Sequence, residues 1–193
     1  MVQFGVGGHN LKGCPDRFVA SESEFSALKE GVKALTCIHC GQCGTLNCHG
    51  ALADQSGAVR GLRFWCCPRR KSHPGCGRSF SIYLGGIIPG YSVPGATLAC
   101  FFLACSQLQG GVLAAWERAK TGFSTDSAYR WVKCLLRNQG EVRTRLCRAR
   151  APPPTRGAGL LADLFEHLSL VLESEAFIKA FQIRFQRPWP MGV

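Results

Sequence analysis

Cysteines constrain the fold of this chain more than any other residue type. The sequence contains 12 cysteines among 193 residues, and seven of them lie between residues 37 and 76. They include Cys37 and Cys40 in the stretch CIHC, the adjacent pair Cys66 and Cys67, and Cys76. A short segment with so many thiols folds around a metal ion, a set of disulfides or a reactive thiol pair.

The cellular compartment decides between these possibilities. The N-terminal stretch MVQFGVGGHNLKGCPDR lacks the basic region and apolar run of a secretory signal, so we expect none. The longest apolar run, ATLACFFLACSQL, is about a dozen residues, too short for a membrane span, and predicts a buried helix. We therefore expect a cytoplasmic protein without membrane association, where reducing conditions favour metal ligation over disulfides.

Cys37 and Cys40 have the spacing of a metal-binding knuckle, in which two thiolates face one tetrahedral ion. Cys66 and Cys76 lie a β-hairpin's length downstream and could complete a four-thiolate site for zinc, or for iron. Such a metal contributes about 10–16 kcal/mol of apparent binding free energy to a small unit with little core. The sequence pattern does not exclude other metal ligands. They are Cys67 in place of Cys66, and Cys43, Cys48, His39, His49 and His73.

A redox role for CIHC is the alternative reading of the same motif. It would require a strand before the motif and a helix beginning at its first cysteine. The sequence instead continues into GQCGTLNCHG, which is typical of a turn. The pattern therefore favours a metal site over thiol chemistry.

The net charge of +11 is concentrated in two regions. Residues 60–80 contain six Arg or Lys and no acid, and residues 117–156 contain ten against three acids. Concentrated basic regions on segments that carry motifs indicate a polyanionic partner, and we expect nucleic acid. The alternative is a solvated basic face that only aids solubility.

The pattern along the chain predicts an α+β protein with four parts. Residues 1–36 form a leader with a short helix in ESEFSALKEGVKAL, and residues 37–90 form a small β-rich zinc ribbon. Residues 91–150 are helical. Residues 151–193 comprise a Pro-rich linker and a C-terminal amphipathic element, in which Phe181, Ile183 and Phe185 alternate as in a strand.

Two stretches of the helical region, GGVLAAWERAKTG and FSTDSAYRWVKCLLRNQG, predict a helix-turn-helix. Ser124 or Thr125 is the expected N-cap of the second helix, and Gly140 its expected end. In this motif the start of the second helix reads base edges and nearby cations hold phosphates. The candidate readers are Thr125, Asp126, Ser127 and Arg130, and the candidate phosphate contacts are Lys120, Lys133, Arg137, Arg143 and Arg145. A loop in the ribbon adds Arg69, Arg70 and Lys71, and Arg78 follows it.

The stretches CIHCGQCGTL, RFWC and GCGRSFS, followed by an apolar helix and a helix-turn-helix, resemble the N-terminal module of bacterial insertion-sequence transposases. The resemblance covers residues 37 to 138. It implies zinc ligands at Cys37, Cys40, Cys66 and Cys76, because Phe64 and Trp65 precede Cys66 as the motif requires. Cys67 is then not a ligand. The long basic loop between Cys66 and Cys76 departs from the tight second knuckle of that family.

The transposase family continues into a catalytic domain with three metal-binding carboxylates. Only 43 residues follow Arg150 here, too few for such a domain, so we expect no enzyme activity. We expect instead a zinc-dependent protein that binds duplex DNA in the bacterial nucleoid, as an accessory or regulator of a mobile element. Its C-terminal element could contact a transposase or a second copy. The alternatives are a zinc-stabilised interaction module whose C-terminal element docks a partner, and an RNA-binding ribbon using Phe64 and Trp65.

Overall fold

The computed structural model describes residues 17–69, 74–107, 111–154, 159–174 and 176–191. Within them it combines a four-stranded sheet with six α-helices, which confirms the predicted α+β class. The chain divides into two compact units. The first comprises residues up to Ser92 together with Gln182–Arg187, and the second comprises Val93–Phe181 and the residues from Pro188 onward.

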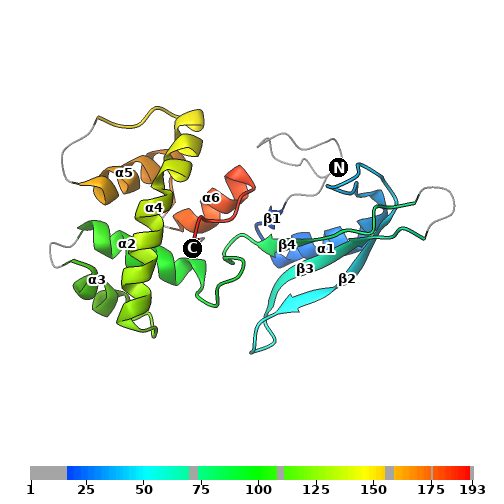
Figure 1. Cartoon of the computed structure of the whole chain (residues 1–193), viewed down its shortest axis with the longest axis horizontal. Coiled ribbons are helices and arrows are strands. Elements are labelled where there is room, and N and C mark those ends of the chain that lie inside the picture. The colour runs from blue at the N-terminus through cyan, green and yellow to red at the C-terminus, as the bar shows by residue number, and fades with distance from the viewer. Residues whose placement is uncertain (1–16, 70–73, 108–110, 155–158, 175, 192–193) are drawn as a thin grey trace. The chain divides into compact units, whose positions relative to one another are not determined.

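The first unit is built on a sheet with the strand order β1-β4-β3-β2 (Figure 1). Strands β2 (Leu46–Ala53), β3 (Val59–Cys66) and β4 (Ser79–Leu84) form an antiparallel meander. The short strand β1 (Phe18–Val19) pairs in parallel with β4. The sheet therefore includes a strand from the segment that the sequence analysis describes as a leader.

One face of this sheet carries the core of the first unit. Side chains alternate between the two faces of a strand, and on β3 Leu62 and Phe64 both point into this core. Helix α1 (Glu22–Glu30) contributes Phe25 to the same cluster. The predicted helix is shorter than its apolar spacing suggests, because it ends at Glu30 and a 3₁₀ turn, η1 (Val32–Ala34), follows it.

The predicted strand over residues 181–185 is wrong, because these residues belong to helix α6 (Phe177–Phe185). An alternation of three apolar residues is too short to exclude a helix. Phe177 and Phe181 are four residues apart and both buried, as one helical face requires. In the first unit, the side-chain amide of Gln182 donates to the carbonyls of Gly85 and Ile87.

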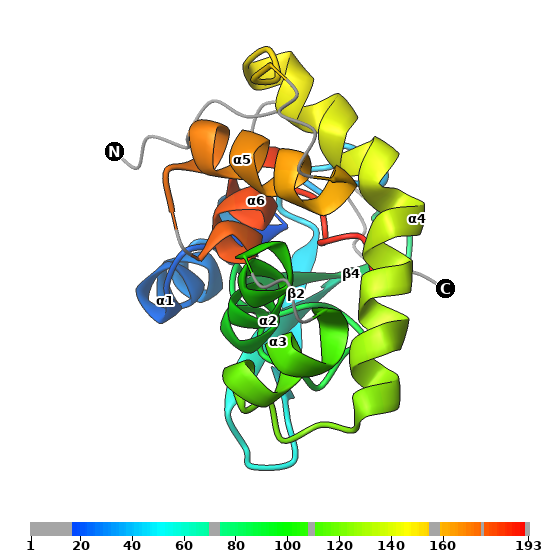
Figure 2. The ribbon, with the colours of Figure 1, turned by 90° about the vertical axis from the view of Figure 1, so that its left-hand side faces the viewer.

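The second unit contains the helices α2 (Gly95–Gln107), α3 (Gly111–Ala119), α4 (Thr125–Ala149) and α5 (Leu160–Leu172). Helix α4 is the longest, with α3 packed near its beginning and α5 near its end (Figure 2). The core between these helices is largely aromatic, with contacts among Phe101, Phe102, Trp131, Phe165, Phe177 and Trp189. None of the described helices is both long and apolar enough to cross a membrane.

Helix α4 begins where the sequence predicts and ends later. Ser124 is its N-cap, because its side-chain oxygen accepts a hydrogen bond from the amide of Ser127. The predicted end at Gly140 is wrong, since the helix continues to Ala149. A glycine inside a helix costs only about 1 kcal/mol, and burial of Val142 and Leu146 beyond it outweighs that cost.

Candidate metal centre and basic helix

The structure brings together the four cysteines that the resemblance selects. One sulfur atom from each of Cys37, Cys40, Cys66 and Cys76 lies within 4.8 Å of the other three. The Sγ atoms of Cys37 and Cys76 are 3.8 Å apart, and those of Cys40 and Cys66 are 3.7 Å apart. Tetrahedral zinc with Zn–S bonds of 2.3 Å places its sulfurs about 3.8 Å apart. The cluster could therefore hold a metal ion, and its spacing fits a tetrahedral ion with thiolate ligands.

The first pair of candidate ligands, Cys37 and Cys40, lies in a tight turn after η1. The amide of Gly41 donates to the carbonyl of Cys37 over 2.9 Å, and the amide of His39 points at the Cys37 sulfur over 3.4 Å. Gly41 has a φ of +72°, a conformation that favours glycine. The turn therefore folds both thiols toward one point.

The second pair repeats this hydrogen-bonding pattern, although nine residues separate Cys66 from Cys76. The amide of Gly77 donates to the carbonyl of Cys66 over 3.0 Å, and the amide of Cys76 points at the Cys66 sulfur over 3.3 Å. Gly77 has a φ of +73°. A further hydrogen bond, from the amide of Gly75 to the carbonyl of Cys67, closes the base of the intervening loop. The basic stretch is therefore an insertion that leaves the knuckle geometry intact.

The adjacent residue Cys67 lies outside this cluster. Its backbone amide donates to the carbonyl of Thr45, which continues the pairing beyond β3. The other candidate ligands have different surroundings, except His73, which lies outside the described residues. Cys43 donates to the carbonyls of Lys33 and Ala34, Cys48 packs against the core, His39 lies against Phe80, and His49 lies against Trp65.

Thr45, which the sequence analysis did not identify, contacts the cluster at Cys66. Its side chain is fully buried, and its hydroxyl lies 3.2 Å from the Cys66 sulfur. A hydroxyl at this distance can donate to a thiolate ligand and fix its orientation. A threonine two residues after a cysteine gives no such signal in the sequence, because only the register of β2 and β3 places it next to Cys66.

The protein environment sets the protonation of the metal-free thiols. Burial raises the pKa of Cys37 to about 12, and burial also raises the pKa of Cys76. For Cys40 burial acts in the same direction, but hydrogen bonds from the amide of Gln42 and from neighbouring thiols lower its pKa to about 7. The metal-free centre therefore keeps protons on Cys37 and Cys76 at neutral pH.

This protonation predicts a steep pH dependence of metal affinity. Zinc binds thiolates, so binding at pH 8 releases at least the protons of Cys37 and Cys76. We expect the apparent zinc affinity to rise by at least about 100-fold per pH unit above pH 7, and more steeply below it, where Cys40 also releases a proton. Competition with a chromophoric chelator at several pH values measures this slope. An affinity independent of pH would contradict the prediction.

Gly75 provides a local test of the second knuckle. A Cβ atom on this residue would lie 2.5 Å from the Cys66 sulfur and 2.7 Å from the Cys67 carbonyl oxygen. We expect Gly75→Ala to displace Cys66 and to weaken zinc binding by about 10- to 100-fold. Gly86→Ala is the matched control, because a Cβ there meets nothing within 4 Å. Equal zinc affinities of the two variants in chelator competition would contradict the proposed geometry.

The predicted nucleic-acid residues of the ribbon are only partly described. Arg69 and Arg78 are exposed on either side of the loop between Cys66 and Cys76. Arg70 and Lys71 lie outside the described residues. The described cations therefore follow two of the candidate metal ligands along the chain, one after Cys66 and one after Cys76.

The predicted residues of the second unit fall into two groups. Lys120, Asp126, Arg130, Lys133 and Arg137 are exposed, and Thr125 is half-buried. The others make contacts within the protein: Ser127 takes part in the N-cap, Arg143 donates to the carbonyl of Leu160, and Arg145 pairs with Glu141 at 3.2 Å.

The sequence analysis missed two exposed residues of α4, Tyr129 and Arg148. Tyr129 is 54% exposed, next to the candidate reader Arg130. Arg148 lies eleven residues, or about three turns, after Arg137 and so on the same face of the helix. A helix that ends at Gly140, as the sequence predicts, does not include Arg148. The sequence therefore did not place Arg137 and Arg148 on one helix face.

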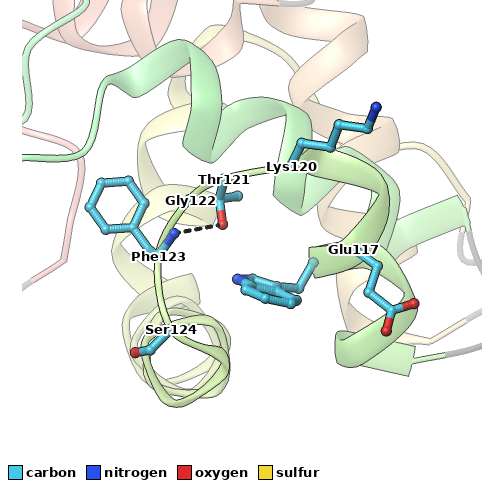
Figure 3. Close-up of a pocket in the computed structure, with 7 residues that line it drawn as sticks. Glu117, Lys120, Thr121, Gly122, Phe123 and Ser124 are labelled. Atoms are coloured by element: carbon cyan, nitrogen blue, oxygen red, sulfur yellow. Dashed lines mark hydrogen bonds between the residues drawn. The ribbon is translucent and has the colours of Figure 1, made fainter.

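A hollow of about 560 Å³ lies between α3 and α4 (Figure 3). It is lined by the residues that connect the two helices and by Trp116 and Glu117 of α3. Thr121 fixes this connection, since its hydroxyl accepts a hydrogen bond from the amide of Phe123 over 3.4 Å. Lys120 and Gly122 both have positive φ values, +45° and +70°, so the turn is tightly shaped.

No family model, curated protein or solved structure matches this chain. The chain's own residues are therefore the basis for a functional assignment. Two features carry it: a cluster of four cysteines that could hold a metal ion, and a long helix with cations on its exposed face.

Proposed function

We propose that the chain is a zinc-dependent protein that binds duplex DNA, an accessory or regulator of a mobile element related to insertion-sequence transposases. The observation that carries the proposal is the distribution of side chains around α4. One face of this helix is buried through Trp131, Leu135 and Val142. Cations occupy the exposed face, on which Lys133 and Arg137 lie one turn apart.

The charge and length of this face suit a phosphate backbone. From Arg130 to Arg148 the helix rises about 27 Å, a length over which duplex DNA presents many phosphates. Two acids, Asp126 and Glu141, belong to the exposed residues of α4, and Glu141 is paired with Arg145. The face therefore has a clear excess of positive charge to offer a polyanion.

The start of α4 is the part best suited to contact bases. Asp126, Tyr129 and Arg130 are exposed within its first two turns. An arginine can bind the acceptors of guanine and an aspartate can accept from cytosine in the major groove. Ser127 contributes less to such contacts, because its hydroxyl lies 3.1 Å from that of Ser124 within the N-cap.

Zinc would have a structural role in this proposal. Four thiolates fill a tetrahedral coordination sphere and leave no open position for a substrate. When bound, the ion would fix the two knuckles against each other, and with them the exposed side chains of Arg69 and Arg78. Binding of DNA by the ribbon would then depend on zinc.

The alternative is an interaction module whose C-terminal element docks a partner. Docking of this kind requires exposed apolar surface, and most of the large apolar side chains of this element are wholly or partly buried. Leu164, Phe165, Leu168 and Phe177 are buried within the second unit. Leu160 is 59% exposed, and Leu161, Leu170 and Leu172 are half-buried. Binding of a transposase or a second copy through residues 151–193 would have to use such remaining positions.

Salt-dependent binding of duplex DNA tests the proposed function. The zinc-loaded full chain is titrated into a fluorescent duplex of arbitrary sequence at several salt concentrations. We expect the logarithm of the affinity to fall linearly with the logarithm of the salt concentration, with a slope of about −3 to −5 for four to five phosphate contacts. Absence of duplex binding at low salt would refute the proposed function and favour the interaction module.

A further inference from the structure

The outer face of the sheet, opposite the core of the first unit, carries an aromatic and basic surface. On β3 the residues Arg63 and Trp65 alternate with the buried Leu62 and Phe64 and so point to this outer face. Trp65 pairs with Asn47 of β2 on one side and Ser79 of β4 on the other, and both neighbours are small polar residues. The indole is therefore the largest side chain in its row of the sheet.

An irregularity in β2 adds a second ring to this surface. The pairing of β2 with β3 shifts between Cys48 and Gly50, so that His49 is an extra residue in the strand. The His49 ring is exposed, and its centroid lies 6.4 Å from that of Trp65. The bulge thus places an exposed imidazole beside the indole.

Trp65 is held in place rather than free to rotate. Its indole Nε1 donates to the carbonyl of Gly77 over 3.1 Å, and Gly77 follows the candidate metal ligand Cys76. A fixed ring loses little conformational entropy when a ligand stacks on it. The side chain is only half-buried, so part of its surface is accessible.

The charge around these rings is positive. Arg63 is exposed on the same face, two residues before Trp65, and Arg78 is exposed beside β4. The acids Glu22, Glu24 and Glu30 belong to α1, which packs on the opposite face of the sheet, and Asp54 lies in the turn of the β2–β3 hairpin. Among the residues that the structure describes, the outer face at β3 therefore combines aromatic rings with cations that these acids do not oppose.

We propose that this outer face binds single-stranded nucleic acid, with Trp65 and His49 stacking on unpaired bases and Arg63 contacting the phosphate backbone. Rings exposed on the face of a sheet need bases that are not already stacked in a duplex, whereas a cation alone would bind either form. This site consists of residues of the first unit, whereas α4 belongs to the second, and it does not depend on the proposed duplex binding. Phe64, the other ring of the expected RNA-binding ribbon, is fully buried and takes no part.

The test uses the zinc-loaded full chain and a fluorescent oligothymidylate of about 12 nucleotides, within the range of known single-strand sites. We expect His49→Ala and Trp65→Leu each to weaken binding by about 5- to 100-fold, the range of one stacked base. Arg63→Ala should weaken it and lower the salt slope by about 0.7. Lys29→Ala is the matched control, because Lys29 is an exposed cation on α1.

The outcome is decided by three readouts: quenching of tryptophan fluorescence in the wild type, its loss in Trp65→Phe, and the affinity of His49→Ala and Trp65→Leu. Binding of the oligothymidylate should quench tryptophan fluorescence in the wild type, and Trp65→Phe should remove this quenching while it retains most of the affinity. His49 is exposed, so His49→Ala tests the site without disturbing the fold. No oligothymidylate binding by the wild type, or unchanged affinity in both His49→Ala and Trp65→Leu, would overturn the inference. Binding of the single strand without the duplex would refute the proposed function alone, and the reverse result would refute this inference alone.

Discussion

Replacing Cys66 with serine is expected to abolish stoichiometric zinc binding, whereas replacing the adjacent Cys67 is expected to preserve it. The Cys66 sulfur belongs to the four-sulfur cluster, and the Cys67 sulfur does not. A complete four-ligand site contributes about 10–16 kcal/mol to the apparent free energy of zinc binding. One of the four ligands therefore contributes about 3 kcal/mol, which corresponds to more than about 100-fold in zinc affinity. The two variants differ by one position, which makes them closely matched controls for each other.

The loss of metal in Cys66→Ser should also weaken the first unit. Cys37 and Cys66 are both fully buried and form part of its core cluster. Without the ion, the metal–sulfur bonds that join the two knuckles are lost at these buried positions. The free energy of unfolding should therefore fall. Metal content after dialysis and unfolding in denaturant measure the two effects. Zinc lost from Cys67→Ser and retained by Cys66→Ser would contradict the assignment of the ligands.

Neutralising the exposed cations of α4 should strongly weaken the binding of duplex DNA. At about 0.1 M salt, each phosphate contact contributes roughly tenfold to affinity through counterion release. We therefore expect the triple variant Arg130→Gln, Lys133→Gln and Arg137→Gln to bind duplex DNA about 1000-fold more weakly. Its salt slope should fall by about 2.7. Fluorescence anisotropy over a range of salt concentrations measures both quantities.

A second triple variant separates the position of the charge from its amount. Lys29→Gln, Lys179→Gln and Arg187→Gln remove the same total charge from exposed residues outside α4. If duplex affinity depends on α4, this control loses much less than the α4 variant. Equal losses in the two triple variants would show that only net charge matters and would contradict a recognition role for α4.

The cysteine cluster could be predicted in part because Cys37 and Cys40 have the spacing of a metal-binding knuckle. The residues alone identified Cys37 and Cys40 as a pair, and the resemblance preferred Cys66 over Cys67. The structure adds a physical reason for that choice, because Cys66 and Cys76 form hydrogen bonds similar to those of the first knuckle. A repeat made by two cysteines with nine residues between them has no signature in the sequence.

Helix α4 shows why element ends are harder to predict than elements. Its beginning has a local chemical cause, the hydroxyl of Ser124, and was predicted. Its continuation past Gly140 depends on the burial of Val142 and Leu146, a tertiary effect. The same kind of packing makes residues 181–185 helical, although their short apolar alternation suggests a strand.

Contacts within the protein explain why the predicted cations are not equivalent. Arg143 and Arg145 look as suitable for phosphates as Arg137 in the sequence. In the structure Arg143 bonds to the carbonyl of Leu160, and Arg145 pairs with Glu141 four residues earlier. The second interaction could have been foreseen from its spacing on a continuous helix, and the first required knowledge of where α5 begins.

The metal content of the wild-type chain, purified without added metal, tests the central claim most directly. X-ray absorption on the same sample identifies the metal and its ligands. We expect about one zinc ion per chain with four sulfur neighbours at about 2.3 Å. Iron at the same four sulfurs would keep the cluster and contradict the choice of zinc. A folded chain without metal, or with the cluster cysteines in disulfides, would contradict the account as a whole.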